Sequence, residues 1–495
     1  MNLSKTNYGF LLVVLVSLVL SLFYIPPHNI LCGDKEVYRY VGRVMLEGGV
    51  PYRDVFDHKP PLIFFLNYAA LALGGDWAQW TMDTLLVLAA SGLFFQLGRK
   101  YNLACPWLLP VLFNLMVRDY AISLGMGMTR EYTTVLFLVF FCVLMGKHRY
   151  RYYFLGSLSG LIFFMQQDQV LALAPLLIYS LLPKEDAAPV VRRILMTAAG
   201  FLSVALPVVL YFAWHGALKD FFEDAFLFNL GWYTTTLKES FGDHLRKMKL
   251  VLDEGWYEVT FMVAATLGVC SLFFRNRNKR LVLACLGAVV LSVIPEFLGG
   301  REVLSNANMM TFTHYYLSLS ASLCILLFVV FAFTEEPALQ GWKAQAIYGA
   351  LVLTSLSYTA LRYGTHLPLL KEDADASMPG LNYLREYKPK DRQLFVFGNT
   401  NLVYAYNTLG IIGPSKWVYQ HFYFLYDNWD RDHGILRSIM GDLLRYRTTY
   451  ILDYSTSPNN RFRDPEVLAL WQAFLAEHYQ PLCGGDEGWL WKFKN

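Results

Sequence analysis

The stretch YRDVFDHKPPL, which begins at residue 52, places two acids, a histidine and a lysine directly before a pair of prolines. Proline favours the first turn of a helix and keeps the preceding residue extended, so the sequence predicts a helix over 61–75 with Lys59 at its start. The free backbone N–H groups and the dipole of a helix start favour an anion. Lys59 is therefore a candidate phosphate-binding residue, with Asp57 and His58 beside it. Contact with lipid headgroups or charge balance with Asp57 would also explain a lysine here.

A second candidate, Asp34, lies upstream at the start of an expected amphipathic helix over 34–46. Apolar residues including Val37, Val41 and Val44 recur at helical spacing, so we expect this helix to lie on the membrane surface. Aspartate is a favourable N-cap residue. The same carboxylate, held at the boundary between water and lipid, can accept a proton from an incoming hydroxyl group. The two roles are compatible.

Further acids collect near the ends of apolar segments. Glu131 follows Arg130 just before an expected span, and an acid near a bilayer calls for a reason. An ion pair with a neighbouring arginine or solvation at the helix end would explain Glu131 without a role in catalysis. Asp168 interrupts an apolar run within MQQDQ, which predicts a tight hairpin, and solvated turn residues explain it equally well.

The segment GGREVLSNANMMTFTHYYL, which begins at residue 299, adds Arg301, His314 and Tyr315 as candidate substrate-binding residues. Arginine can bind a phosphate through two parallel N–H groups. A lone histidine at an interface is also a common polar anchor, and tyrosines are typical of the aromatic belt of membrane proteins. Both interpretations remain open for these three residues.

The composition identifies the class of protein that must position these residues. Hydrophobic residues make up 55% of the 495 residues and charged residues only 16%, and the apolar residues gather in long blocks. Globular proteins average about a quarter charged residues. The sequence therefore predicts a polytopic α-helical membrane protein. The net charge of +3 and the absence of a basic stripe interleaved with aromatic residues exclude nucleic acid as a partner.

A membrane-spanning helix needs about 20 mostly apolar residues, and the sequence contains about 11 candidates. Loops rich in lysine and arginine favour the cytoplasmic side of a membrane. The chain has four short basic loops between these candidates, and this set of spans places all four on the cytoplasmic side. Counting 61–75 as a further span would move these loops outside, so this segment is expected to be a juxtamembrane helix at the outer interface. The expected spans cover residues 8–25, 80–98, 103–117, 132–146, 154–166, 169–182, 194–214, 256–274, 281–298, 313–333 and 344–362.

The last part of the chain changes in character, which predicts two domains, 1–363 and 364–495. The segments DRQLFVFGNTNLVYAYNTLG, TTYILDY and GWLWKFK each contain one expected strand, and together they indicate a small α/β domain with a mixed sheet on the outer face. Most of the seven cysteines lie in or against apolar segments and are expected to pack as small hydrophobes. A disulfide between Cys32 and Cys483 is compatible with this topology.

The run GDKEVYRYVGRVMLEGGVPYRDVFDHKPPL resembles the first outer loop of the GT-C superfamily of glycosyltransferases, which use polyprenyl-phosphate-linked sugars. It is most similar to the branch of the protein O-mannosyltransferases and the aminoarabinose transferases that modify lipid A. The likeness is strongest over residues 30–135, is weaker to about residue 335, and does not extend to the C-terminal domain. The matching positions are Asp34, Tyr38, Arg43, Met45, Phe56, Asp57, Lys59, Pro60, Pro61 and Leu62.

This resemblance implies an inverting transfer of a sugar from a polyprenyl-phosphate carrier to a hydroxyl group of an envelope glycan, lipid or protein. Asp34 would be the general base, Lys59 would bind the donor phosphate, and Glu131 would be a second catalytic acid. Relatives commonly have another acid directly after the first aspartate, whereas this chain has Lys35 at that position. The resemblance therefore does not decide whether a divalent metal takes part. The resemblance also implies the bacterial inner membrane, an extracytoplasmic active site, and an outer domain without catalytic residues.

Two other classes of protein share several of these features. A transporter or flippase for a lipid-linked sugar would also need many spans, but transporters tend to carry their charges near the bilayer midplane, often within two repeated halves. The charges here are peripheral and one-sided, and no such repeat is evident. A glycan polymerase would share the compartment and the lipid substrate. It would be expected to have a large outer loop between late spans in place of a terminal domain.

Overall fold

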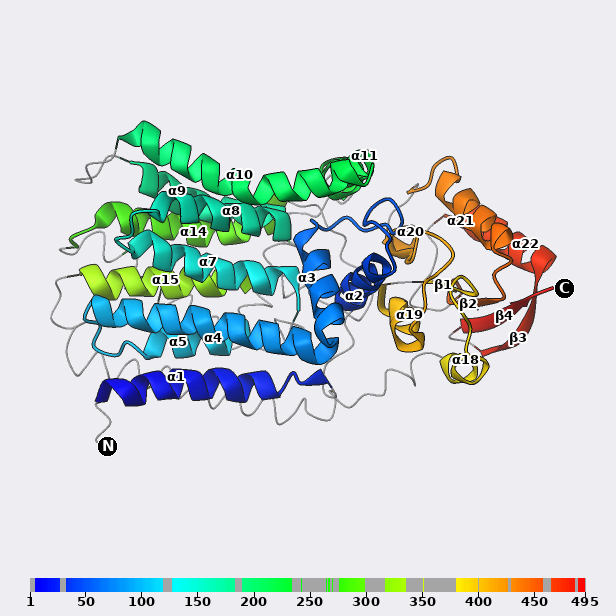
Figure 1. Cartoon of the computed structure of the whole chain (residues 1–495), viewed down its shortest axis with the longest axis horizontal. Helices are drawn as coiled ribbons and strands as arrows, with labels where there is room; N and C mark the ends of the chain where they lie inside the picture. Colours follow the sequence, from blue (N-terminus) through cyan, green and yellow to red (C-terminus); the bar gives the residue numbers. More distant parts are fainter. Residues whose placement is uncertain are drawn as a thin grey trace. The chain divides into compact units, whose positions relative to one another are not determined.

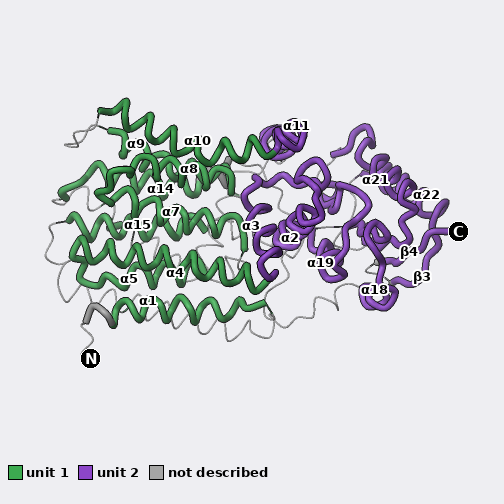
Figure 2. Tube along the Cα trace, in the orientation of Figure 1, with its two compact units in different colours: residues 1–30, 76–211, 233–370 green, residues 31–75, 212–232, 371–495 purple. Residues whose placement is uncertain are grey.

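The chain forms two compact units, shown in Figure 2. Unit 1 comprises residues 1–30, 76–211 and 233–370, and unit 2 comprises residues 31–75, 212–232 and 371–495. The expected domain boundary at 363/364 lies outside the described residues. The computed structural model describes residues 5–26, 33–118, 127–182, 189–233, 242, 264, 266–267, 269, 276–298, 317–334, 350, 380–398, 400–425, 429–456, 464–485 and 488–494.

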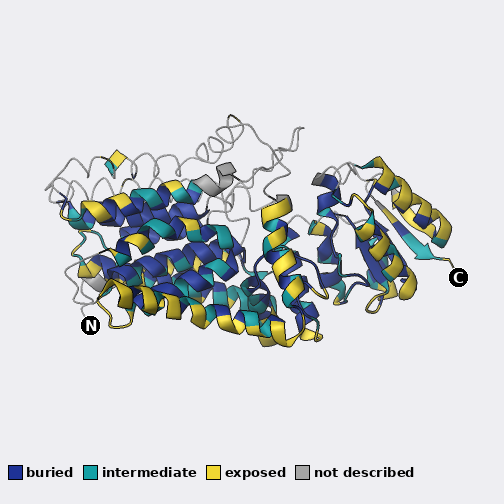
Figure 3. Ribbon diagram, turned by 90° about the horizontal axis from the view of Figure 1, so that it is seen from above, coloured by how far each residue is buried: buried dark blue, intermediate teal, exposed yellow. Residues whose placement is uncertain are grey.

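Unit 1 is a bundle of helices that run along one common direction (Figure 1). Buried residues face the inside of the bundle, as Figure 3 shows, because the apolar blocks of the sequence pack against one another. The helices are α1 (Lys5–Leu22), α4 (Asp76–Lys100), α5 (Leu108–Val117), α7 (Thr129–Met145), α8 (Arg151–Met165), α9 (Val170–Leu181), α10 (Val190–Trp214), α14 (Lys279–Leu298) and α15 (Leu317–Phe333).

Most of the expected spans coincide with these helices, and the break at MQQDQ is a short 3-10 helix, η2 (Gln167–Gln169). The helix expected over 103–117 begins only at Leu108. Residues 101–107 form turns, in which the Leu103 N–H donates to the carbonyl oxygen of Gly98 over 2.9 Å. The expected spans over 256–274 and 344–362 lie almost wholly outside the described residues.

Helix length agrees with a membrane location for part of unit 1. Among the described helices, α4 and α10 are long and apolar enough to cross a bilayer, and several apolar helices are shorter. Close helix packing uses glycine: a Cβ on Gly156 of α8 would lie 1.9 Å from the carbonyl oxygen of Thr197, and one on Gly200 of α10 would lie 1.9 Å from that of Tyr153. Small residues at such crossings let the backbones of α8 and α10 approach closely.

Unit 2 contains the two helices expected in the opening loop. The amphipathic helix α2 (Gly33–Leu46) buries Val37, Val41 and Val44, as its helical periodicity predicts. The helix α3 (Leu62–Leu73) begins directly after Pro61 and ends at Gly74. Three short helical segments from the middle of the chain also belong to this unit, apart from the final residue of the third. They are α11 (Leu218–Phe222) and the π-helical turns η3 (Glu223–Leu227) and η4 (Asn229–Tyr233).

The C-terminal part of unit 2 contains a mixed four-stranded sheet in the order β1-β2-β4-β3. The strands β1 (Leu394–Phe397) and β2 (Tyr450–Asp453) are parallel, and β4 (Gly488–Phe493) runs antiparallel to β2. These three strands lie where the sequence analysis placed them. The fourth, β3 (Tyr479–Gly485), pairs with β4 and was not predicted.

Helices accompany this sheet and complete its core. They are α18 (Leu381–Tyr387), η7 (Thr400–Val403), α19 (Tyr404–Leu409), α20 (His421–Leu425), α21 (Gly434–Arg445) and α22 (Pro465–His478). The indole of Trp471 on α22 stacks on Phe397 of β1 with 4.2 Å between ring centroids. Asp464 caps the start of α22, since its carboxylate accepts the backbone N–H of Glu466 over 2.9 Å. Apolar side chains of α21 and α22 therefore form one core with the sheet.

Helix α2 packs on this C-terminal part through specific polar contacts. The backbone N–H of Gly413 donates to the hydroxyl of Tyr40 over 2.8 Å, and the amide of Asn407 donates to the Glu36 carboxylate over 2.7 Å. At the start of α2, a Cβ on Gly33 would lie 2.3 Å from Thr400 Oγ1, so only glycine allows this approach. The segment with α2 and α3 and the C-terminal sheet therefore belong to a single compact unit.

Candidate functional site

The loop between α2 and α3 holds Asp57 and Lys59 in a fixed arrangement. The backbone N–H of Lys59 donates to Asp57 Oδ1 over 2.8 Å, and the hydroxyl of Tyr52 donates to the Lys59 carbonyl oxygen over 2.7 Å. Tyr52 is itself buried, with its ring 5.8 Å from that of Phe64 and 5.6 Å from that of Phe221. Both charged residues are buried as well. The loop is therefore a rigid element.

Asp34 lies in the first turn of α2 and is partly exposed. The hydroxyl of Tyr38, one turn later, lies 3.4 Å from Asp34 Oδ2, and the Tyr38 ring packs against Phe64 of α3. The Tyr38 side chain is 1% exposed, so its position is set by packing. Among the described residues, the Asp34 carboxylate has this long hydrogen bond and no ion pair.

Electrostatics connects Asp34, Asp57 and Lys59. Burial raises the pKa of Asp57 to about 7, and the negative charge of Asp34 acts in the same direction. The backbone N–H and the positive charge of Lys59 act in the opposite direction. The three groups are therefore close enough for the charges of Asp34 and Lys59 both to act on Asp57. Within the described part of the chain, the Lys59 ammonium group makes no hydrogen bond or ion pair.

His58 lies beside this group and faces aromatic rings. Its Nδ1 is 3.7 Å from Asp57 Oδ1, and its ring lies 5.6 Å from Phe228 and 5.7 Å from Phe422. The side-chain amide of Asn229 donates to the His58 carbonyl oxygen over 2.6 Å. Residues of the π-helical turns and of the C-terminal part thus fix His58, and sequence patterns gave no signal for these long-range contacts.

The C-terminal segment supplies further residues that sequence analysis missed. The backbone N–H of Phe56 donates to the Lys416 carbonyl oxygen over 2.8 Å, and the Phe56 ring lies 4.6 Å from that of Trp417. Lys416 Nζ lies 3.7 Å from Asp224 Oδ2. Burial raises the pKa of Asp224 to about 7, against the effect of the Lys416 charge. His421 follows in the same segment, and the charge of Asp34 acts on it as well.

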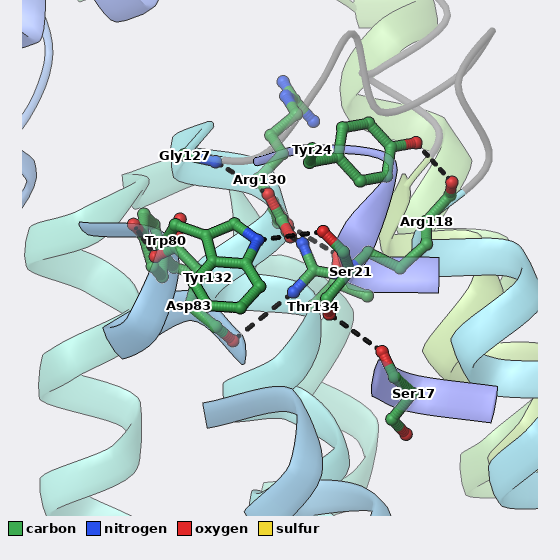
Figure 4. A network of polar contacts seen from close by, with 11 residues as sticks. Ser17, Ser21, Tyr24, Trp80, Asp83, Arg118, Gly127, Arg130, Tyr132 and Thr134 are labelled. Carbon is green, nitrogen blue, oxygen red and sulfur yellow. Dashed lines mark hydrogen bonds and ion pairs between the residues drawn. The ribbon is translucent and has the colours of Figure 1, made fainter. Parts of the chain in front are cut away.

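Glu131 belongs to a buried polar network inside unit 1, part of which Figure 4 shows. Its carboxylate pairs with Arg118 through Oε1 and accepts the backbone N–H of Gly127 over 2.9 Å through Oε2. Arg118 also contacts the carbonyl oxygen of Asp83, whose carboxylate accepts a hydrogen bond from Tyr132. Glu131 and Arg118 are each at most 2% exposed, so solvation at a helix end does not explain Glu131. The sequence does contain one sign of this network, because Asp83 is an acid inside an apolar segment.

The neighbouring acid Asp168 is also paired. Arg130 Nη2 donates to Asp168 Oδ2 over 2.9 Å, and the amides of Gln166 and Gln169 donate to the same carboxylate over 2.7 Å and 2.9 Å. The MQQDQ turn is therefore held to the start of α7 by an ion pair, and Asp168 is more than a solvated turn residue.

The remaining expectations concern residues elsewhere in the chain. Arg301, His314 and Tyr315 lie outside the described residues, as do Cys32 and Cys270. Cys483 is a free, exposed thiol, and Cys142, Cys285 and Cys324 are free thiols packed in the bundle. The part of the chain that the structure describes contains no group of three histidine, cysteine, aspartate or glutamate side chains arranged to hold a metal ion.

Taken as a whole, the chain has the GT-C fold. The chain is similar to ArnT from Cupriavidus metallidurans bound to undecaprenyl phosphate, with a TM-score of 0.63 and 13% identity over 99% of this chain and 98% of that chain. The apo state of ArnT matches with a TM-score of 0.64 at the same identity and coverage. No protein-family model matches the sequence, and no curated protein does. The predicted GT-C fold is confirmed, and the match covers 99% of the chain. The number of spans and the place of the C-terminal domain on the outer face stay predictions.

Proposed function

We propose that the protein is an inverting glycosyltransferase that moves a sugar from a polyprenyl-phosphate carrier to a hydroxyl group of an envelope acceptor. The observation that carries this proposal is the arrangement of Asp34, Asp57 and Lys59, in which one carboxylate and one ammonium group of the described chain have no ion-pair partner. A fold shared with a protein solved in complex with undecaprenyl phosphate supports the same conclusion.

The chemistry needs one base and one cation. A phosphate is a good leaving group, so the reaction depends on deprotonation of the acceptor and on stabilisation of the departing charge. In this proposal, Asp34 accepts the proton of the acceptor hydroxyl, and the acceptor oxygen forms a bond to the sugar as the bond to phosphate breaks. Lys59 binds the phosphate that leaves with the electron pair. Asp57 holds the backbone of Lys59 in place, His58 lies between these two residues, and Tyr38 contacts Asp34 from the next turn of α2.

The second acid has contacts that favour a positioning role. Both carboxylate oxygens of Glu131 accept hydrogen bonds, one from Arg118 and one from Gly127. A buried carboxylate with this set of donors is well suited to hold the start of α7 against Arg118 and Gly127. We propose that Glu131 supports the reaction in this way, and that Arg301, His314 and Tyr315 contact the donor.

The proposed topology has about 11 spans, consistent with the length that a bilayer requires. Residues 1–363 would form the transmembrane domain, and residues 364–495 an extracytoplasmic domain of a bacterial inner-membrane protein. The donor phosphate would then lie at headgroup depth while its isoprenoid chain stays in the hydrocarbon. The described residues do not include a cluster that fits a divalent metal, so no step is assigned to one.

The test compares cells with and without the gene. Mass spectrometry of envelope glycans and lipids should show one sugar missing in the deletion strain. The purified protein in lipid nanodiscs should then transfer that sugar from undecaprenyl phosphate to the envelope fraction of the deletion strain. A flippase would change the side on which the lipid-linked sugar is found without transferring it, and a polymerase would change glycan length. Either result would contradict the proposal.

A further inference from the structure

The start of α2 lies at the carboxyl end of strand β1. Gly33 approaches Thr400, which comes three residues after the last residue of β1, so closely that a Cβ on Gly33 would lie 2.3 Å from Thr400 Oγ1. Asp34 is the next residue of α2. Strands β1 and β2 are parallel, and α/β sheets carry their ligand sites beyond the carboxyl ends of parallel strands. The C-terminal sheet thus presents this edge to Asp34.

Gln420 fixes a second segment to the same edge. Its backbone N–H donates to the Gly398 carbonyl oxygen over 2.8 Å, and its Oε1 accepts the backbone N–H of Gly398 over 2.7 Å. The side-chain amide donates to the Trp417 carbonyl oxygen over 2.8 Å. Gln420 is 2% exposed, so these bonds are shielded from water. The backbone position of the next residue, His421, is therefore well defined.

His421 carries an unused hydrogen-bonding atom. Its Nδ1 is buried and has no hydrogen-bond partner among the described residues. Buried polar atoms are nearly always paired, and an exception calls for an explanation such as a role in catalysis. Burial lowers the pKa of His421, so the imidazole is neutral at pH 7, while the negative charge of Asp34 acts in the opposite direction. A neutral imidazole with a free nitrogen is a proton acceptor.

We propose that His421 takes over the proton that Asp34 removes from the acceptor hydroxyl. This inference rests on the function proposed above. In the first step the acceptor O–H bond breaks and its proton binds the Asp34 carboxylate. The acceptor oxygen forms a bond to the sugar, and the sugar–phosphate bond breaks and gives its electron pair to phosphate. In the second step the proton leaves Asp34 and binds Nδ1 of His421. The imidazolium then releases it to water, which restores both residues for the next turnover.

This assignment gives the C-terminal region a direct part in the reaction. The resemblance in sequence had implied an outer domain without catalytic residues. A histidine that only packs in the core would not need to be basic. Dependence of the rate on a base at this position therefore separates the proposal from a structural role.

The first experiment does not depend on catalysis. Protein labelled with ¹⁵N-histidine in lipid nanodiscs is titrated by NMR, with the His421 signal assigned from its loss in His421→Asn. Because the charge of Asp34 raises the pKa of His421, we expect Asp34→Asn to lower that pKa. The variant Asp391→Asn, which removes an acid elsewhere in unit 2, should leave it unchanged. A His421 pKa that is the same in the wild type and in Asp34→Asn would overturn the inference.

The second experiment uses chemical rescue of the transfer reaction. We expect His421→Ala to lower kcat by about 100-fold or more, the range typical of proton-transfer groups, with an unchanged KM for the undecaprenyl-phosphate donor. Added imidazole should restore the rate. Pyrazole, which has nearly the same shape but is a much weaker base, should not. Rescue by both molecules, or a wild-type kcat in His421→Ala, would overturn the inference.

The two experiments separate the inference from the proposed function. If the wild-type protein transfers sugar and His421→Ala does so at the same rate, the function stands and the inference fails. If the wild-type protein transfers no sugar from any donor, the proposed function fails and the catalytic role of His421 fails with it. The NMR titration still decides whether Asp34 and His421 are coupled.

Discussion

Asp57 accepts the backbone N–H of Lys59 through Oδ1, over a distance of 2.8 Å. The two residues are separated by His58 alone, so the hydrogen bond closes a tight turn directly before α3. Tyr52 closes the same turn from the other side by donating to the Lys59 carbonyl oxygen. Two hydrogen bonds within the loop therefore fix the backbone at Lys59. Its ammonium group makes no hydrogen bond or ion pair among the described residues and is left to bind a ligand.

Substitution of Lys59 tests its role in phosphate binding. Hydrogen bonds to charged groups contribute about 1.5–3 kcal/mol, so we expect Lys59→Ala to weaken binding of undecaprenyl phosphate by roughly 10- to 150-fold. Lys59→Arg should retain part of the affinity because it keeps the charge. Binding to protein in nanodiscs would be measured by equilibrium dialysis of labelled lipid. The exposed Lys390→Ala serves as the control, and equal affinities for Lys59→Ala and Lys390→Ala would exclude this role.

The raised pKa of Asp57 predicts a specific dependence of stability on pH. The pKa is about 7 in the folded protein against an ordinary value of 3.8, so between these values the folded state binds more protons than the unfolded state. The free energy of unfolding therefore falls as the pH rises from about 4 to about 7, and no further above that. Asp224 adds to this fall, because burial also raises its pKa to about 7.

Asp57→Asn removes the part of this dependence that belongs to Asp57. Asparagine keeps the oxygen that accepts the Lys59 N–H but has no proton to lose. The free energy of unfolding of the variant minus that of the wild type should be up to about 4 kcal/mol larger at pH 8 than at pH 4. Each unit of pKa shift corresponds to about 1.4 kcal/mol. Apparent melting temperatures at the two pH values provide the measurement. If the difference in melting temperature between variant and wild type were the same at both pH values, the pKa of Asp57 would not be raised in the folded protein.

The approach of Gly33 to Thr400 can be tested with one added methyl group. A Cβ on Gly33 would also lie 2.6 Å from Asn401 Oδ1, so Gly33→Ala must displace α2 from η7. We expect a loss of about 1–3 kcal/mol, as for overpacking elsewhere, together with reduced transfer. Gly441→Ala, in helix α21 where nothing lies within 4 Å of the added Cβ, is the matched control and should be neutral or slightly stabilising. Equal melting temperatures for the two variants would show that α2 does not dock as described.

The ion pair between Arg118 and Glu131 predicts a large effect on stability. Removing one partner of a buried ion pair costs about 3–5 kcal/mol, because the other charge remains buried. We therefore expect Arg118→Ala to lower the melting temperature strongly. Glu131→Gln should also lower the melting temperature, since it leaves the buried Arg118 charge without a carboxylate. The exposed Arg99→Ala should change little. If Arg118→Ala melted like Arg99→Ala, the pair would have no structural role.

Local patterns in the sequence predicted most of the described elements. The apolar blocks predicted the bundle helices, and the helical spacing of Val37, Val41 and Val44 predicted α2. Strand β3 was missed because its sequence YQPLCGG contains a proline and two glycines, which are typical of turns. Antiparallel pairing with β4 makes this segment a strand, although its own residues do not favour one.

The candidate site was predictable only where its residues lie close in sequence. Asp34, Asp57 and Lys59 come from one loop, and proline and helix-start signals mark that loop. His421 and Lys416 reach the site through the fold of the C-terminal part, and no local pattern encodes that contact. Likewise, the partner of Glu131 is Arg118, and only the packing of unit 1 shows that this pair is buried.

The central claim is that Asp34 is the base of a sugar transfer, and the Asp34→Asn variant tests it most directly. Single-turnover transfer from the undecaprenyl-phosphate donor should be measured for wild type and variant, together with donor affinity. The account predicts a rate lower by about 100-fold or more with donor affinity retained, because the amide cannot accept the proton but leaves the phosphate site intact. Transfer by Asp34→Asn at the wild-type rate would contradict it.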